Sequence, residues 1–396
     1  MATLSRPSPR PRPPQPAFYN DPRVRSVVYQ LVAVALVFAA VAYLVHNTLT
    51  NLARLGVASG FGFLQRQAGF PIAQTAIDYT AADTFARAFV VGFINTVVVA
   101  MLGIVLATII GFAIGIARLS RNWLVSRFAA AYVETVRNIP VLLQLLLVYA
   151  ILIHILPQAR ESLTVGSLFL LNTGGLYVPR PLPQAGFGIV AGVALVVVIV
   201  LPILLGALRR HRVQTGKGIP ASVVVIGLLL LIPIAYFAAG RPLAFDLPQM
   251  GKFRPSGGTV LQPEFVALTL GLSIYTASYI AEIVRSGILA VSKGQWEAAG
   301  SLGLSRAQTL RLIVIPQALR VIIPPLTNQY LNLTKNSSLA VAIGYPDFFN
   351  VAGTINNQTG QAVEVVAITM GVYLLLSLIT SAFMNWYNAR IALVER

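Results

Sequence analysis

Long apolar segments with almost no charge recur along this chain, and they constrain its fold more than any other feature. A helix needs about 20 apolar residues to cross the hydrocarbon of a bilayer, and only helices or closed barrels satisfy their backbone groups there. The pattern therefore predicts an all-α polytopic membrane protein with about eight spans. The candidate spans are residues 27–45, 88–117, 131–149, 187–208, 220–239, 264–291, a seventh that Pro324 and Pro325 are expected to interrupt, and 361–386.

Charge is scarce and is confined to particular places. Only 10% of the residues are charged and 56% are hydrophobic, which excludes an ordinary soluble domain. The net charge of +17 could suggest nucleic acid, but the basic residues mark the ends of apolar segments and form no single basic face. We therefore expect a lipid bilayer as the surroundings and no nucleic acid as a partner.

The distribution of Lys and Arg predicts the topology. Residues 1–26 are rich in Pro and Arg and are expected to form a disordered cytoplasmic tail. Residues 27–45 could be a signal peptide, but the apolar run is long and no clear cleavage site follows, so a retained helix is favoured. Most Lys and Arg residues then fall on the cytoplasmic side if an even number of spans places both termini there.

Residues 293–316 form a polar island between two apolar segments. Trp296, Ala299 and Leu302 recur at helical spacing, which predicts a short amphipathic helix that ends or bends at Gly300 and Gly303. Ser305 and Gln308 have the spacing of a capping box and predict a second helix. Such a helix-turn-helix at the membrane surface favours a docking site for another protein; a plain interfacial helix is the alternative.

This island resembles the EAA signature of membrane subunits in bacterial ABC importers. The resemblance implies a type I importer permease core, and it makes residues 293–316 the coupling loop that a cytoplasmic ABC ATPase dimer would hold. One departure is Ile315, which stands where leucine usually precedes the proline. The matching residues are Glu297, Ala298, Ala299, Gly303, Ile313 and Pro316.

Other segments resemble the polar amino-acid (histidine permease) branch of this family. They are the run from Glu134 through Arg137 and Pro140 to Gln144, the run from Tyr279 to Val291, and the T-K-N-S-S-L-A segment that includes Lys335. Glu134 and Arg137, at i and i+3, are expected to pair on one helix face, with part of this segment as a candidate pathway lining. The branch implies a periplasmic amino-acid-binding protein, a second related permease subunit and the bacterial inner membrane.

Two inserted spans distinguish this chain from the compact members of the branch. We expect residues 27–86 to hold the first span and an external loop, and residues 87–157 and 264–396 to form the permease core. Residues 158–263 form an insertion, with two helices within 187–239, a Gly- and Pro-containing loop at 158–186 and an external loop at 241–263. The insertion resembles the larger membrane subunits of general L-amino-acid ABC transporters, which implies broad amino-acid specificity.

Polar residues cluster in the two spans that flank the loop. A charged group facing lipid at a helix centre costs about 2.5–3.5 kcal/mol, so such clusters normally face other helices or a water-filled path. They are candidates for the path of an amino acid, whose two charges need paired donors and acceptors; hydrogen bonding between helices is the alternative. The candidates are Tyr275, Ser278, Tyr279, Glu282, Gln329, Asn332, Lys335 and Asn336.

No residue pattern supports catalysis by the chain itself. It has no phosphate-binding loop, so ATP hydrolysis is expected on a partner. It has no cysteine, and His46, His154 and His211 have no metal-ligand spacing, so neither a metal nor a cofactor is expected. Two other functions stay open: a permease for another small polar solute, and an ion-coupled secondary transporter. The latter would favour deep acidic residues and inverted repeats, which the sequence does not show.

Overall fold

The computed structural model describes residues 22–54, 59–166, 168–216, 220–251 and 254–391. Within these ranges seven helices are long and apolar enough to cross a membrane, or up to eight if one bent pair is counted as a single span. The long helices are α1 (Pro22–Arg54), α2 (Phe85–Ala117), α5 (Phe187–Thr215), α6 (Ala221–Ala238), α7 (Pro263–Leu289), α10 (Ile315–Asn336) and α12 (Ala362–Ile391). The predicted tail lies mostly outside the described residues, and α1 already begins at Pro22.

The predicted third span, 131–149, contains a sharp bend. It is divided between α3 (Trp123–Asn138) and α4 (Val141–His154), which meet at 107°. The cause is Pro140, since a proline disfavours helical angles at the residue before it, and Ile139 is extended. The Gln144 amide donates to the carbonyls of Val136 and Ile139 at 2.7 and 2.8 Å, so carbonyls left free by the break are satisfied inside the protein.

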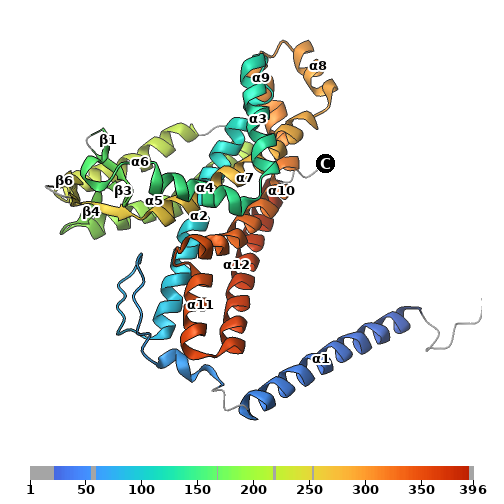
Figure 1. The fold of residues 1–396 in the computed structure, drawn as a ribbon. Coiled ribbons are helices and arrows are strands. Elements are labelled where there is room, and N and C mark those ends of the chain that lie inside the picture. The colour runs from blue at the N-terminus through green and yellow to red at the C-terminus, as the bar shows by residue number, and fades with distance from the viewer. Residues whose placement is uncertain (1–21, 55–58, 167, 217–219, 252–253, 392–396) are drawn as a thin grey trace, which may run out of the picture.

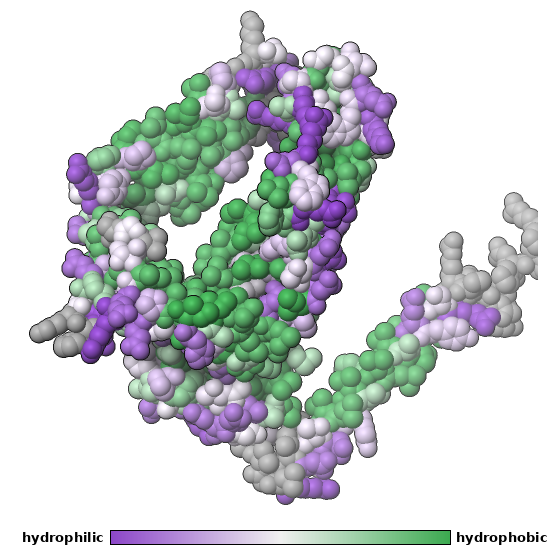
Figure 2. Space-filling model, turned by 45° about the horizontal axis from the view of Figure 1, so that its top comes forward, coloured by the Kyte–Doolittle hydropathy of each residue, from purple (hydrophilic) through white to green (hydrophobic). Residues whose placement is uncertain are grey.

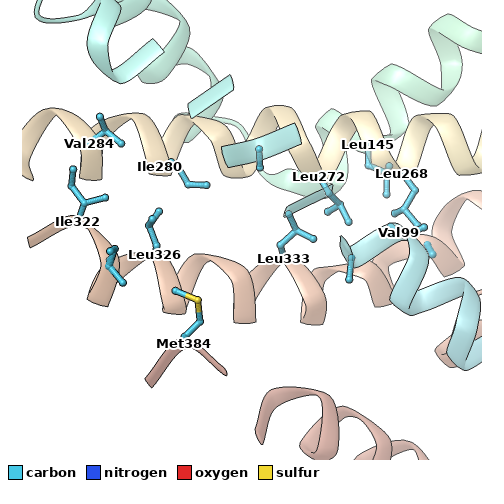
Figure 3. Close-up of a cluster of buried hydrophobic side chains, with 14 of the residues drawn as sticks. Val99, Leu145, Leu268, Leu272, Ile280, Val284, Ile322, Leu326, Leu333 and Met384 are labelled. Carbon is cyan, nitrogen blue, oxygen red and sulfur yellow. The ribbon is translucent and has the colours of Figure 1, made fainter. Parts of the chain in front are cut away.

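The core is built where α7 packs against α2, α4 and α10. Val284 and Ile280 on α7 point toward Ile322 and Leu326 on α10 (Figure 3). On the α2 side, a Cβ at Gly115 would lie 2.7 Å from the Ala281 carbonyl oxygen. Gly115 and the Gly111 one turn earlier therefore allow the helix approach that their spacing predicts.

The seventh span differs from the prediction in one respect. The helix α10 continues through Pro324 and Pro325, so the expected interruption is wrong. The irregularities lie at its two ends instead, with a π-helix at Leu310–Val314 before it and a 3-10 helix at Ser337–Ile343 after it.

A second cluster of buried residues closes the opposite end of the bundle. It joins a 3-10 helix (Phe61–Gln65), the start of α2, and the short helix α11 (Phe348–Thr359) to α12. The buried Asn95 amide ties these parts together, since it donates to the carbonyls of Gln74 and Pro346 at 2.9 Å each. Figure 1 shows α11 at this end and α8 and α9 at the other.

The segments on either side of α5 and α6, which the sequence predicts as loops, contain short strands. A four-stranded antiparallel sheet has the order β1-β2-β3-β8, and two further pairs are β4-β5 and β6-β7. Strands before α5 thus pair with strands after α6. The strands are β1 (Leu163–Val165), β2 (Phe169–Asn172), β3 (Gly175–Val178), β4 (Arg180–Pro183), β5 (Leu243–Asp246), β6 (Gln249–Met250), β7 (Pro255–Ser256) and β8 (Thr259–Leu261).

Candidate functional site

The loop between α7 and α10 folds as two short helices joined by a tight turn. The first, α8 (Lys293–Ser301), ends because Gly303 adopts φ +70°, a conformation that glycine takes without strain. The amide of Leu304 donates to the carbonyl of Ala299, and that of Gly303 to the carbonyl of Gly300. These two bonds form a Schellman motif, so the predicted role of Gly303 as a helix stop is confirmed.

The second helix, α9 (Arg306–Thr309), begins with the predicted capping box. The Ser305 backbone amide donates to the Gln308 side-chain oxygen at 2.9 Å, and the Gln308 amide donates to Ser305 Oγ at 3.4 Å. Both turns of this loop are therefore fixed by local hydrogen bonds. The loop is a folded unit that lies at one end of the helix bundle (Figure 1).

The loop residues divide into an anchored and an exposed set. Ala299 is fully buried, and Trp296 packs against the core. Leu302, in contrast, is 78% exposed, although it is a large apolar residue. Among the predicted coupling residues, Glu297, Ala298, Gly303 and Pro316 are exposed and Ile313 is half-buried. The exposed face can therefore contact another protein.

On α7, the candidate path residues contact one another and α3. The hydroxyls of Tyr275 and Tyr279 are 3.1 Å apart. The Arg137 guanidinium lies 5.0 Å from the centre of the Tyr279 ring. In the described residues Arg137 makes no ion pair with Glu134, so the predicted pairing of these two is wrong. Ser278 is buried and donates to the Tyr275 carbonyl of its own helix.

Glu282 lies one turn further along α7 and is bound by two arginines. Its carboxylate accepts from Arg285 at 2.6 Å and forms an ion pair with Arg118 at the end of α2. Sequence reasoning missed Arg118, because no local signal relates residues so far apart in the chain. The pair fastens α2 to α7 close to the loop.

The candidates on α10 lie together on a different surface. Asn332 and Lys335 are exposed, whereas Gln329 and Asn336 are half-buried. By helical spacing Gln329 and Asn336 lie along the edge of the stripe of buried Ile322, Leu326 and Leu333, and Lys335 is on the opposite side of the helix. Within the described residues no hydrogen bond or ion pair joins them to the α7 set, so the structure presents two separate polar surfaces.

At the other end of the bundle, Asp347 is fully buried and starts α11. It accepts from the Asn350 amide at 2.9 Å and from the Tyr373 hydroxyl at 3.2 Å. Burial raises the pKa of this carboxyl to about 6, against the lowering effect of these donors. Sequence reasoning did not single out this residue. Among the described residues no group of three or more His, Cys, Asp or Glu could hold a metal ion.

The structure has membrane-spanning helices packed around a tight core. Two of these helices, α7 and α10, carry polar residues, and a folded loop connects them. These features define a multi-pass membrane transport subunit. A family model, "Binding-protein-dependent transport system inner membrane component", matches residues 212–393. Full-length relatives match as well, and the chain belongs to this family, the permease subunits of ABC importers. It is thus an inner-membrane transport component rather than the ATPase, and the family implies an ATPase and a binding protein as partners.

Three relatives align over nearly their whole length. The general L-amino acid transport system permease protein AapQ of Rhizobium johnstonii is 52% identical, with 95% of this chain and 94% of the relative covered. The putative amino-acid ABC transporter permease protein YhdX of Escherichia coli is 50% identical, over 96% and 97%. The glutamate/glutamine/aspartate/asparagine transport system permease protein BztB of Rhodobacter capsulatus is 39% identical, over 95% and 96%.

Proposed function

We propose that this chain is the translocation subunit of an ATP-driven importer for L-amino acids of broad specificity. The observation that carries the proposal is the full-length similarity to relatives whose names specify general L-amino acid transport or several amino acids. Substrate chemistry is consistent with it. A zwitterion needs both donors and acceptors along its path, and the polar faces of α7 and α10 offer hydroxyls, amides and charges.

The proposed path uses both polar surfaces, the one on α10 and the separate one on α7. Asn332 and Lys335 are exposed in a helix that is otherwise suited to a membrane, which favours contact with water or with a polar solute over contact with lipid. Tyr275 and Tyr279, both half-buried, supply hydroxyls beside Arg137. Glu282 belongs to the same surface, with its charge balanced by two arginines.

Coupling to ATP hydrolysis takes place at the loop of residues 293–316. Closure of an ATPase dimer pulls on this loop, and the spans rock between outward-open and inward-open states. The anchored Ala299 and Trp296 transmit the force to the core, while the exposed Glu297 and Leu302 contact the ATPase.

A second, related permease subunit completes the path. The exposed polar face of α10 needs a protein partner, because lipid would leave its amides and ammonium group without hydrogen bonds. In this arrangement residues 87–157 and 264–396 form the core and residues 158–263 an insertion. Both termini and the 293–316 loop lie in the cytoplasm, in agreement with the basic residues Arg210 and Arg212 near the end of α5.

Uptake of labelled L-amino acids into vesicles tests this function. The vesicles contain the chain, a partner permease, the ATPase and the binding protein, and Glu297→Lys and Gly303→Asp are compared with wild type. We expect ATP-dependent uptake that both variants abolish while they remain in the membrane. Glu161→Lys, at an exposed site outside the loop, is the charge control. Uptake that survives both loop changes, or that runs on an ion gradient without ATP, would refute the proposal.

A further inference from the structure

The two inserted helices, α5 and α6, form a hairpin that none of the roles above uses. Figure 2 shows the surface of the hairpin as nearly continuously apolar, and Figure 1 shows the strands at one end of it. We call residues 209–217, at the other end, the basic tip. We propose that the basic tip and the apolar side chains next to it form a binding site for anionic phospholipid. The inference goes beyond the proposed function and needs only the membrane orientation given there.

The two helices of the hairpin pack against each other and leave most of their surface open. In the most apolar stretch of α6 none of the residues is buried, and in that of α5 only 11% are. A Cβ added at Gly192 or Gly206 of α5, or at Gly227 of α6, would meet nothing within 4 Å. Because both helices are long and apolar enough to span a membrane, lipid is the surrounding that suits this surface.

The basic tip lies where the hydrocarbon of the membrane ends. No charged residue occurs from Phe187 to Leu208, a helix length of about 33 Å at 1.5 Å per residue, which is close to the hydrocarbon thickness of about 30 Å. The helix α5 continues beyond this stretch to Thr215. Its last turns, which carry Arg210 and Arg212, therefore lie at the level of the lipid headgroups.

The strands determine the side of the membrane on which the basic tip lies. The strand β8 pairs with β3, which precedes α5, and β8 leads directly into α7, so the base of the hairpin and the start of α7 are neighbours. Two helices that cross the membrane from neighbouring starts end on the same side. The basic tip therefore lies on the side of the loop of residues 293–316, which is cytoplasmic in the proposed orientation. Anionic lipids give the cytoplasmic leaflet a negative surface potential.

No acidic residue of the hairpin balances the charge of the basic tip. Four residues within 209–217 are Lys or Arg, and no Asp or Glu occurs between Glu161 and Asp246. Arg210 and Arg212 are exposed, and Arg210 forms no ion pair within the described residues. Clusters of Lys and Arg directly cytoplasmic of a spanning helix attract anionic headgroups. The charge of the tip therefore favours an anionic ligand.

Apolar side chains close to the basic tip specify the other half of the ligand. Ile203 on α5 is 67% exposed and Val223 on α6 is 57% exposed. A free phosphate ion would use the arginines and leave these side chains uncovered. A phospholipid covers both, since its phosphate accepts hydrogen bonds from guanidinium groups and its acyl chains pack along the apolar side chains. The tip selects anionic over zwitterionic lipid, because the cation of a zwitterionic headgroup offsets the phosphate.

Quenching of a fluorophore by brominated lipids tests the inference in vesicles that contain the reconstituted importer complex. The chain has no cysteine, so with cysteine-free partner subunits a fluorophore on Val223→Cys reports on the lipid beside the basic tip. Ile189→Cys, at an exposed site near the opposite end of α5, is the matched control position. We expect dibrominated phosphatidylglycerol to associate at Val223→Cys about fivefold more strongly than dibrominated phosphatidylcholine, and neither lipid to be preferred at Ile189→Cys.

Charge variants in the Val223→Cys background assign this preference to the basic tip. Arg210→Gln with Arg212→Gln should remove most of the preference, and high salt should weaken it when both arginines are present. Arg121→Gln with Arg127→Gln removes two exposed arginines between the end of α2 and the middle of α3, and should leave the preference intact.

Three outcomes would overturn the inference. They are equal association of the two lipids at Val223→Cys, an equal loss of preference in the two arginine pairs, and no quenching by either lipid, which would show that protein covers this end of the hairpin. Uptake of labelled L-amino acids by the same vesicles measures the proposed function separately. If uptake is absent while the lipid preference is present, only the proposed function is refuted.

Discussion

The helices α7 and α6 are both long and apolar enough to span a membrane, but they differ in burial and in polarity. In the most apolar stretch of α7, 61% of the residues are buried inside the protein, against none in α6. α7 is also the less apolar of the two and carries Glu282 and Arg285, whereas α6 has no charged residue. A helix enclosed by protein finds partners for polar groups, and a helix surrounded by lipid does not. Polar residues within a membrane span therefore indicate that the span is in contact with other parts of the protein.

The largest effect should follow from placing a charge in the lipid-facing hairpin. Leu230 lies near the centre of α6 and is 51% exposed. We expect Leu230→Asp to cost about 2.5–3.5 kcal/mol of insertion free energy. Glycosylation mapping of the α5–α6 hairpin in membranes measures this cost. Leu230→Ala is the control and should insert as wild type does; full insertion of the aspartate variant would show that α6 is enclosed by protein in the assembly.

A somewhat smaller effect is expected where two helices meet inside the protein. Gly115→Leu places a side chain where even a Cβ would be 2.7 Å from a backbone oxygen of α7, so α2 and α7 must separate. We expect a loss of about 1–3 kcal/mol in stability, measured by thermal unfolding in detergent. The same change at Gly227 in α6 meets open space and should shift stability by less than about 0.5 kcal/mol. Equal responses at the two glycines would remove the distinction between enclosed and lipid-facing helices.

A third expected effect is a dependence of stability on pH, confined to the enclosed end of the bundle. The pKa of Asp347 is raised from 3.8 to about 6 by burial, so between these values the folded protein binds more protons than the unfolded chain. Stability should therefore rise as the pH falls from about 6 to about 4, and be independent of this group above about 6.

Thermal unfolding against pH, in detergent, measures this contribution. Asp347→Asn cannot ionise and should lose the dependence between pH 4 and 6. Asp78→Asn removes an exposed carboxylate and should leave it intact. A profile that is identical in wild type and Asp347→Asn would mean that the buried carboxyl does not titrate in this range.

Local signals in the sequence predicted the parts that local chemistry determines. The spans follow from length and hydropathy, and the loop between α7 and α10 follows from Gly303, Ser305 and Gln308, whose hydrogen bonds reach no further than a few residues. The spacing of Gly111 and Gly115 is likewise typical of a close helix contact, although it does not identify α7 as the neighbour.

Contacts between distant residues could not be predicted in this way. Arg118 and Glu282 are brought together only by the packing of α2 on α7, and Arg137 lies over Tyr279 because α3 crosses the same helix. The pairings of β3 with β8 and of β4 with β5 could not be predicted, because the partners are separated in sequence by the whole α5–α6 hairpin. Pro324 and Pro325 suggested a break, but the surrounding helices hold α10 in one piece.

The pairing of β4 with β5 has a further consequence for how such a chain can be assembled. The Gln184 amide donates to the Pro242 carbonyl at 2.9 Å, and Pro183 is directly opposite Leu243. The entrance and the exit of the whole α5–α6 hairpin are therefore neighbours in space. Replacing residues 185–241 with a two-residue turn would leave β4 and β5 as an ordinary β-hairpin. The two membrane helices are thus an insertion at the tip of a β-hairpin. Such an insertion can be gained or lost without changing the path of the rest of the chain.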